Sequence, residues 1–160
     1  MNKVNNNQPF NLNVLIIFIP IVLGFLTSFF CSPTGPSGPS GPNGPNGPNG
    51  PPKAFKPPAA LFSVVWPVLY LLLGYAWYLS NVDGKSKLLM NSMFILLNVL
   101  LCAWLITYGC VKNKYFSFYI LLSSVLVSFL LYTLLDIKWS KLCLCPLIVW
   151  LSFATLLSFN

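Results

Sequence analysis

The chain has 160 residues, of which 56% are hydrophobic and only 7% are charged, and its mean hydropathy is +0.75. This composition excludes a water-soluble domain and predicts an integral membrane protein. The net charge of +7 is the balance of nine lysines and two aspartates. Because the sequence lacks histidine, glutamate and arginine, it lacks the side chains for imidazole catalysis, carboxylate dyads and histidine-based metal sites.

Five apolar segments that contain no lysine or aspartate follow one another along the chain. Each is about as long as the roughly 17 to 25 residues that a membrane-spanning helix needs. The lysines lie singly or in pairs at the segment ends, which indicates membrane flanking and no nucleic-acid partner. The sequence therefore predicts an all-α integral membrane fold, a single domain over residues 1–160 with five transmembrane helices at about 14–31, 59–80, 88–110, 115–135 and 142–159.

The first segment has an alternative interpretation. Lys3 precedes an apolar run, as in a cleaved signal peptide, but signal cores usually span only about 7 to 15 residues and no small-residue cleavage site stands out. Five helices would place the two termini on opposite sides of the membrane. The lysines divide almost equally between the two sides, so the sequence leaves the orientation open.

A low-complexity tract, residues 35–52, separates the first two segments. It repeats Gly-Pro-Ser, Gly-Pro-Asn and finally Gly-Pro-Pro, which is the period of collagen. A triple helix needs three chains and usually more triplets, so we expect a semi-stiff, extended, solvated linker, with trimerisation as the alternative.

The second segment begins with a pair of prolines, Pro57 and Pro58, which suit the first turn of a helix. Aromatic residues then recur every fourth position at Phe62, Trp66 and Tyr70. This spacing gathers aromatic surface on one stripe of the helix, which Leu73 and Trp77 continue.

Two further helices carry faces of interest. In the third segment Asn91 and Asn98 are seven residues apart and share a face with Cys102, and buried amides should turn away from lipid. The fifth segment carries a stripe of Pro146, Trp150, Phe153, Ala154 and Leu157. Together these faces predict an aromatic-walled interior suited to a flat, mostly apolar ligand.

Each of these features has a simpler explanation. The stripes could be ordinary helix packing, and Asn98 could form a hydrogen bond between helices. Aromatic residues at the membrane surface explain Tyr75, Trp77, Tyr78 and Trp139. The five cysteines are expected to be small buried hydrophobic residues, with a redox or ligand-contact role as the alternative; on a helix, Cys143 and Cys145 cannot chelate one metal ion.

The sequence resembles the TspO/MBR family, the tryptophan-rich sensory proteins and the translocator protein also called the peripheral-type benzodiazepine receptor. The family signature of Pro-Pro, Phe, Val-Trp, Leu-Tyr and Gly is matched by Pro57, Pro58, Phe62, Val65, Trp66, Leu69, Tyr70 and Gly74. A second signature in the last helix is matched by Pro146, Trp150, Phe153, Ala154 and Leu157. The resemblance covers roughly residues 53–160, and the first helix matches by position only.

Several positions depart from the family pattern. Phe55 stands where the family has a tryptophan, Leu147 where it has a tyrosine and Ser158 where it has an asparagine. The collagen-like tract replaces most of the first loop, which lids the pocket in the family. In the third helix, either Asn98 or Trp104 is in register with the family residues, and not both.

The resemblance implies a membrane receptor or translocator that binds tetrapyrroles such as protoporphyrin, with sterols or benzodiazepine-type compounds as further ligands. We expect no cofactor and no metal, and we prefer metal-free porphyrin to haem because histidine is absent. The resemblance implies these ligand-binding residues: Pro57, Pro58, Phe62, Trp66, Tyr70, Asn98, Trp104, Trp150, Phe153, Ala154 and Leu157.

Two alternatives to a binding protein stay open. One is an enzyme that degrades porphyrin in light, a chemistry attributed to some members of the family. The other is a membrane-anchored assembly protein that trimerises through the Gly-Pro tract. The resemblance also implies a homodimer, for which Gly24, Gly74 and Ala76 would allow close helix contact. The sequence does not distinguish the mitochondrial outer membrane from other cellular membranes.

Overall fold

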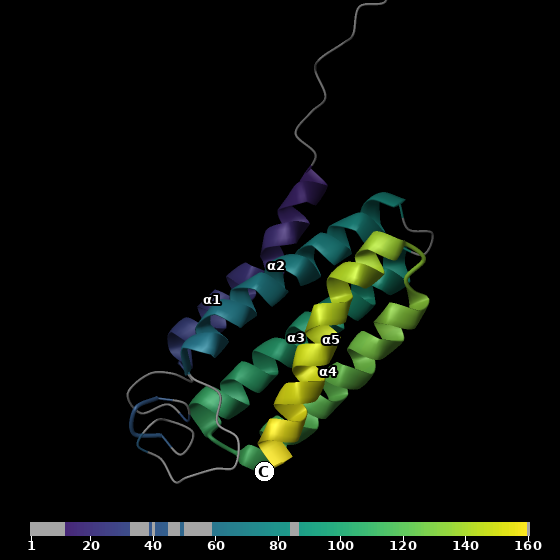
Figure 1. Cartoon of the computed structure of the whole chain (residues 1–160). Coiled ribbons are helices and arrows are strands. Elements are labelled where there is room, and N and C mark those ends of the chain that lie inside the picture. Colours follow the sequence, from purple (N-terminus) through teal and green to yellow (C-terminus); the bar gives the residue numbers. More distant parts are fainter. Residues whose placement is uncertain are drawn as a thin grey trace, which may run out of the picture.

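The computed structural model describes residues 12–32, 39, 41–44, 49, 59–83 and 87–159. This part of the chain is helical throughout, apart from short turns, and its helices lie side by side along one long direction (Figure 1). The elements are the 3₁₀-helix η1 (Leu12–Phe18), α1 (Ile19–Phe30), α2 (Ala59–Asp83), α3 (Lys87–Ile106), the π-helical turn η2 (Thr107–Val111), α4 (Lys114–Leu134) and α5 (Lys138–Phe159).

Four helical segments of the described chain are long and apolar enough to cross a membrane: Ser63–Val82, Lys87–Val111, Lys114–Leu134 and Lys138–Ser158. The predicted multi-pass membrane protein is thereby confirmed. The first apolar helix, Val14–Phe30, is shorter than these four. When η1 is counted with α1, the observed helix limits differ from the predicted ones by at most four residues.

The first helix changes its geometry at Pro20. Proline has no amide hydrogen, so Pro20 cannot donate to the preceding turn, and the α-helix begins at Ile19 with this proline in its first turn. The residues before it form a 3₁₀-helix, which rises about 2.0 Å per residue instead of 1.5 Å. The two parts together extend to about 32 Å, which is close to the thickness of the hydrocarbon core.

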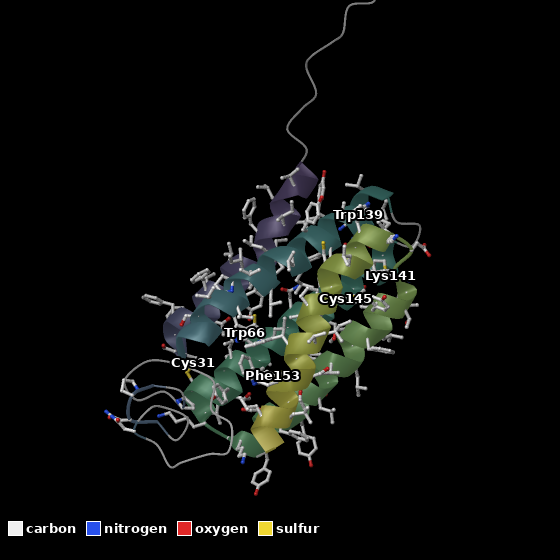
Figure 2. The ribbon with its side chains drawn as sticks, viewed as in Figure 1. Cys31, Trp66, Trp139, Lys141, Cys145 and Phe153 are labelled. Carbon is white, nitrogen blue, oxygen red and sulfur yellow. A yellow bond between two sulfur atoms is a disulfide. The ribbon has the colours of Figure 1, made fainter. Side chains whose placement is uncertain are left out.

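The helices form a closed ring in the order α1, α2, α5, α4, α3, because each contacts the next and α3 also contacts α1. α2 contacts α3 as well, across the ring. One end of the bundle is formed by the end of α1, the start of α2, η2, the start of α4 and the end of α5. We call it the disulfide end, for the bond between Cys31 and Cys110 that lies there. Figure 2 shows Cys31 at this end and Trp139 and Lys141 at the opposite end.

Glycines let the first two helical segments approach closely. A side chain at Gly74 in α2 would collide with the backbone carbonyl of Ile17 in η1, and one at Gly24 in α1 would collide with the ring of Tyr70. Both glycines are therefore used inside the bundle, and Ala76 is also fully buried. The homodimer stays a prediction, but Gly24, Gly74 and Ala76 are buried inside the bundle and are not available for contacts between two chains.

The packed face of α4 is lined with serines. Ser117, Ser124 and Ser128 are buried, at the spacing that places them on one side of the helix with Leu121 and Leu131. Their hydroxyls donate to backbone carbonyls of α4 or of its N-cap, Asn113. Small side chains of this kind let neighbouring helices approach closely in a membrane.

Most of the collagen-like tract lies outside the described residues, as do Pro57 and Pro58. One turn is described, where the amide of Gly44 donates to the carbonyl of Gly41 at 3.0 Å. A polyproline II helix has no internal hydrogen bonds, so at this turn the chain departs from the extended linker that we expected.

We predict that Gly74→Val lowers the stability of the bundle by about 2 kcal/mol or more, because the new side chain meets backbone and no flexible side chain can give way. Thermal unfolding in detergent would measure this loss. Val68→Ile is the matched control, since it adds volume on an exposed position of the same helix. Equal melting temperatures for the two variants would show that η1 and α2 are not in backbone contact.

Candidate ligand-binding site

The indole of Trp66 lies where α2, α3 and α5 meet. It stacks on Trp104 of α3, with ring centroids 4.9 Å apart and an interplanar angle of 29°. It also meets Trp150 of α5 edge to face, with centroids 6.4 Å apart and an angle of 88°. Trp66 is only 9% exposed, so its ring faces the interior of the bundle and not lipid.

Three further rings extend this contact. Tyr70 lies 5.6 Å from Trp66 along α2, Phe153 lies 5.6 Å from Trp150 along α5, and Tyr108 stacks on Trp104 at 5.3 Å. These separations fall within the range of favourable aromatic pairs. We refer to the six residues as the aromatic cluster: Trp66, Tyr70, Trp104, Tyr108, Trp150 and Phe153.

The aromatic cluster lies toward the disulfide end of the bundle, and Figure 2 shows Trp66 and Phe153 on that side of the middle. Trp66 is seven positions from the start of α2, and Trp104 is seven positions from the end of η2. At 1.5 Å per residue, the cluster therefore lies about 10 Å from that end, measured along the helices.

Two buried polar atoms accompany the rings. The hydroxyl of Tyr70 and the indole Nε1 of Trp104 are buried and find no hydrogen-bond partner among the described residues. Leaving a buried donor without a partner costs about 1 to 3 kcal/mol, so proteins usually avoid it. The cluster thus combines a large apolar surface with two donors that a guest molecule with acceptor atoms could use.

Prolines interrupt the backbone hydrogen bonds beside the cluster. Pro67 directly follows Trp66 in α2, and Pro146 precedes Trp150 by one turn in α5. Each removes one helical hydrogen bond and frees a carbonyl one turn earlier. Both helices are therefore easier to bend where they carry the central indoles than in an uninterrupted stretch.

The third helix reaches the disulfide end through η2. Tyr108, Gly109 and Cys110 belong to this wide turn, in which Tyr108 stacks on Trp104 and Cys110 bonds to Cys31. Gly109 is required here because a side chain would collide with the carbonyl of Cys31.

The chain then reverses into α4. Lys112 takes a left-handed conformation with φ of 55°, which ends η2. Asn113 caps α4 because its side-chain oxygen accepts from the amide of Phe116 at 3.1 Å. This turn fixes the direction in which α4 leaves the disulfide end.

Polar contacts hold the opposite end of the bundle. The indole Nε1 of Trp77 donates to Oδ1 of Asn91 at 2.6 Å, and Nδ2 of Asn81 donates to the same oxygen at 2.8 Å. Ser140 of α5 donates to the carbonyl of Ala76 at 2.8 Å. These bonds join α2 to α3 and α2 to α5, so the end away from the cluster is fixed by directional interactions.

The described residues contain no group of three histidine, cysteine, aspartate or glutamate side chains that could hold a metal ion. The chemistry of the site is therefore that of aromatic surfaces and a few uncharged polar atoms. Aromatic surfaces of this kind suit large flat molecules, whose rings they could bury and stack.

The model of the TspO/MBR family matches residues 16–160, which is nearly the whole chain. The chain belongs to the TspO/MBR family. No individual curated protein matches it in sequence. The family resemblance proposed from the sequence is thus confirmed, and the match extends to the first helix, which the sequence signatures had placed by position only. At the level of the TspO/MBR family, the protein is a membrane translocator of the class that binds tetrapyrroles or sterols.

The structure brings together most of the residues predicted for the TspO/MBR pocket. Trp66, Tyr70, Trp104, Trp150 and Phe153 belong to the aromatic cluster, and Ala154 is buried beside them in the hydrophobic core. That these residues bind a ligand stays a prediction. Pro57, Pro58 and the side chain of Phe62 lie outside the described residues.

The fifth helix presents a slightly different face from the predicted stripe. Pro146 is exposed and Leu157 is only half-buried, whereas Leu147 and Leu151 are fully buried. An α-helix has 3.6 residues per turn, so residues spaced four apart shift gradually around its surface. In addition, α5 packs against both α2 and α4, so its buried face is wider than the predicted stripe. Trp150 and Phe153 consequently lie on the flank of the buried face, toward α2.

Asn98 and Trp104 have different surroundings in the third helix. Trp104 stacks in the cluster, whereas Asn98 is buried with its Nδ2 bonded to the carbonyl of Phe94 in its own helix at 2.8 Å. The hydrogen bond between helices is instead made by Asn91. Trp77, which we had considered for the membrane surface, is 6% exposed and bonded to that asparagine.

Two features of the candidate site were not predicted from the sequence. Tyr108 joins the cluster only because η2 turns its ring onto Trp104. Cys31 and Cys110 form a disulfide across 79 residues of sequence; Cys31 is buried as expected, whereas the expectation of burial is wrong for Cys110, which is exposed. The position of both cysteines at segment ends was the available signal, but their pairing depends on α1 and α3 ending side by side. The other cysteines are free and half-buried: Cys102, Cys143 and Cys145.

We predict that Asn91→Leu lowers stability by about 1 to 2 kcal/mol, because the buried indole N–H of Trp77 loses its acceptor. Thermal unfolding measures the loss, and Ser92→Ala is the control because Ser92 is exposed and bonds only within its own helix. Since Asn91 lies at the end away from the cluster, ligand affinity should change little. A large loss of affinity without a loss of stability would contradict the separation of the two ends.

Proposed function

We propose that this protein binds a metal-free tetrapyrrole of the protoporphyrin type within the aromatic cluster, as a membrane receptor or translocator. The contact of Trp66 with both Trp104 and Trp150 carries the proposal, because it gathers three indoles from three helices at one point. A porphyrin offers a wide planar ring whose burial and stacking would supply most of the binding free energy.

The rings of the cluster contact one another, so a planar guest has to insert between them. Insertion would separate Trp66 from Trp104, and the interrupted helices at Pro67 and Pro146 give α2 and α5 the freedom to move apart. In this view the cluster is a set of stacking surfaces that exchange their mutual contacts for contacts with the guest.

The two partnerless donors suggest how the guest is oriented. The hydroxyl of Tyr70 and Nε1 of Trp104 would donate to acceptor atoms of the ligand, such as the carboxylates of protoporphyrin. Sterols and benzodiazepine-type compounds are also mostly apolar and carry few acceptors, so they remain candidates for the same cluster. Competition against bound porphyrin would rank them.

Our first functional prediction concerns the indole stack. Trp66→Leu should weaken protoporphyrin binding by about tenfold, because leucine keeps apolar bulk but removes the stacking surface. Quenching of tryptophan fluorescence during a titration measures the affinity. Trp139→Leu is the matched control, since Trp139 is 68% exposed at the opposite end of the bundle. Unchanged affinity in Trp66→Leu and Trp150→Leu would refute the proposed site.

Our second prediction is that one substitution, Tyr70→Phe, raises the stability of the ligand-free protein and lowers its affinity for the ligand. Tyr70→Phe removes a buried hydroxyl without a partner among the described residues, so it should raise the stability of the ligand-free protein by up to about 1 kcal/mol. The same change should weaken protoporphyrin binding by about fivefold, because the ligand loses a donor.

Thermal unfolding and fluorescence titration on the same samples test both signs. Tyr75→Phe is the control on the same helix, because Tyr75 is 42% exposed and outside the cluster. A fall in stability with no change in affinity would show that the hydroxyl has a structural partner and does not contact the ligand. Analysis of the porphyrin after illumination would reveal intact ligand for a binding protein and cleaved products for the alternative enzyme.

A further inference from the structure

The disulfide joins the two helices that close the ring at the edge of the aromatic cluster. Cys31 directly follows α1 and its amide donates to the carbonyl of Thr27 at 2.9 Å, so the residue is held by the last turn of that helix. Cys110 lies in η2, and the Cα atoms of the two cysteines are 5.0 Å apart. The bond therefore fixes the distance between α1 and the end of α3.

The disulfide is coupled to the cluster through adjacent residues. Gly109 packs against the carbonyl of Cys31, and Tyr108 stacks on Trp104, which in turn stacks on Trp66. On the other side of the bond, α1 contacts the ring of Tyr70 through its glycine. Both elements that the disulfide holds together thus touch rings of the cluster.

A flat ligand inserting between Trp66 and Trp104 separates α2 from α3, and α3 can contribute to this separation by moving outward. The hydrogen bonds of Trp77 and Asn91 hold α3 against α2 at the opposite end, so α3 can swing out most easily at the disulfide end. The covalent bond to Cys31 restrains that movement.

We propose that the Cys31–Cys110 disulfide is a redox-sensitive clamp on the α1–α3 edge of the aromatic cluster, which slows ligand exchange when it is formed. The effect on ligand exchange rests on the proposed function, whereas the restraint that the disulfide places on α1 and α3 does not. A disulfide persists only in an oxidising environment, so the clamp stays closed only where the disulfide end faces such a compartment. Its reduction would then release the bound ligand faster.

The chemistry of opening is thiol–disulfide exchange. Cys31 is 8% exposed, whereas Cys110 is exposed and can be attacked by the thiolate of a small dithiol. The attack breaks the bond between the two protein sulfurs and forms a mixed disulfide on Cys110, while Cys31 leaves as a thiolate that takes up a proton. The second thiol of the reagent then displaces Cys110, so two electrons and two protons reach the protein and the reagent becomes a cyclic disulfide.

Two measurements on the full-length protein in lipid nanodiscs test the clamp. Hydrogen–deuterium exchange of residues 104–111 should be faster after treatment with dithiothreitol, without any ligand present. Stopped-flow quenching of tryptophan fluorescence should show protoporphyrin associating and dissociating about three- to tenfold faster in the reduced protein. The double variant Cys31→Ser, Cys110→Ser should behave as the reduced protein does and should no longer respond to dithiothreitol.

The control variant Cys143→Ser keeps the disulfide and removes a free, half-buried cysteine, so it should respond to dithiothreitol as the wild type does. Equal deuterium uptake in the oxidised and reduced forms would overturn the clamp, and so would faster uptake with unchanged porphyrin kinetics. If porphyrin quenches no form of the protein, the proposed function fails, and the deuterium measurement alone decides the conformational clamp.

Discussion

The indole of Trp66 is the point at which three helices of the bundle meet. Within lipid, apolar surface gains little by moving from the outside of a helix bundle to its inside, so packing has to be decided by shape and by specific contacts. Trp66 supplies such contacts to α3 through Trp104 and to α5 through Trp150. The arrangement of α2, α3 and α5 around one ring explains why the candidate site lies there.

The two ends of the bundle are held in different ways. At one end Trp77, Asn81 and Asn91 form directional hydrogen bonds that tie α2 to α3. At the other end the rings stack, and a disulfide holds α1 to η2. Stacked rings can slide or separate at low cost compared with broken hydrogen bonds in a membrane, so adaptability is concentrated at the end that carries the cluster.

Much of the fold could be predicted from the sequence because membrane helices are coded locally. A charge-free apolar run has to satisfy its own backbone hydrogen bonds in lipid, so a span such as that of α4 is recognised without its neighbours. Trp66 and Tyr70 are one turn apart, so their shared face follows from helix geometry, and both are buried. The hydrogen bonds of Trp77 and Asn98 could not be predicted in this way. The sequence left more than one partner open for each residue. The position of Asn91 beside Trp77 decided the outcome for Trp77, whereas Asn98 bonds to the carbonyl of Phe94 in its own helix.

The sequence by itself determined the membrane class, the number and approximate limits of the apolar helices, and the family, because these depend on composition and on spacing within single segments. The tertiary structure decided which helices are neighbours, that Trp104 and Tyr108 join the cluster, and that Cys31 bonds to Cys110. These features depend on contacts between residues far apart in the chain, and no local pattern specifies the distance between two helices in space.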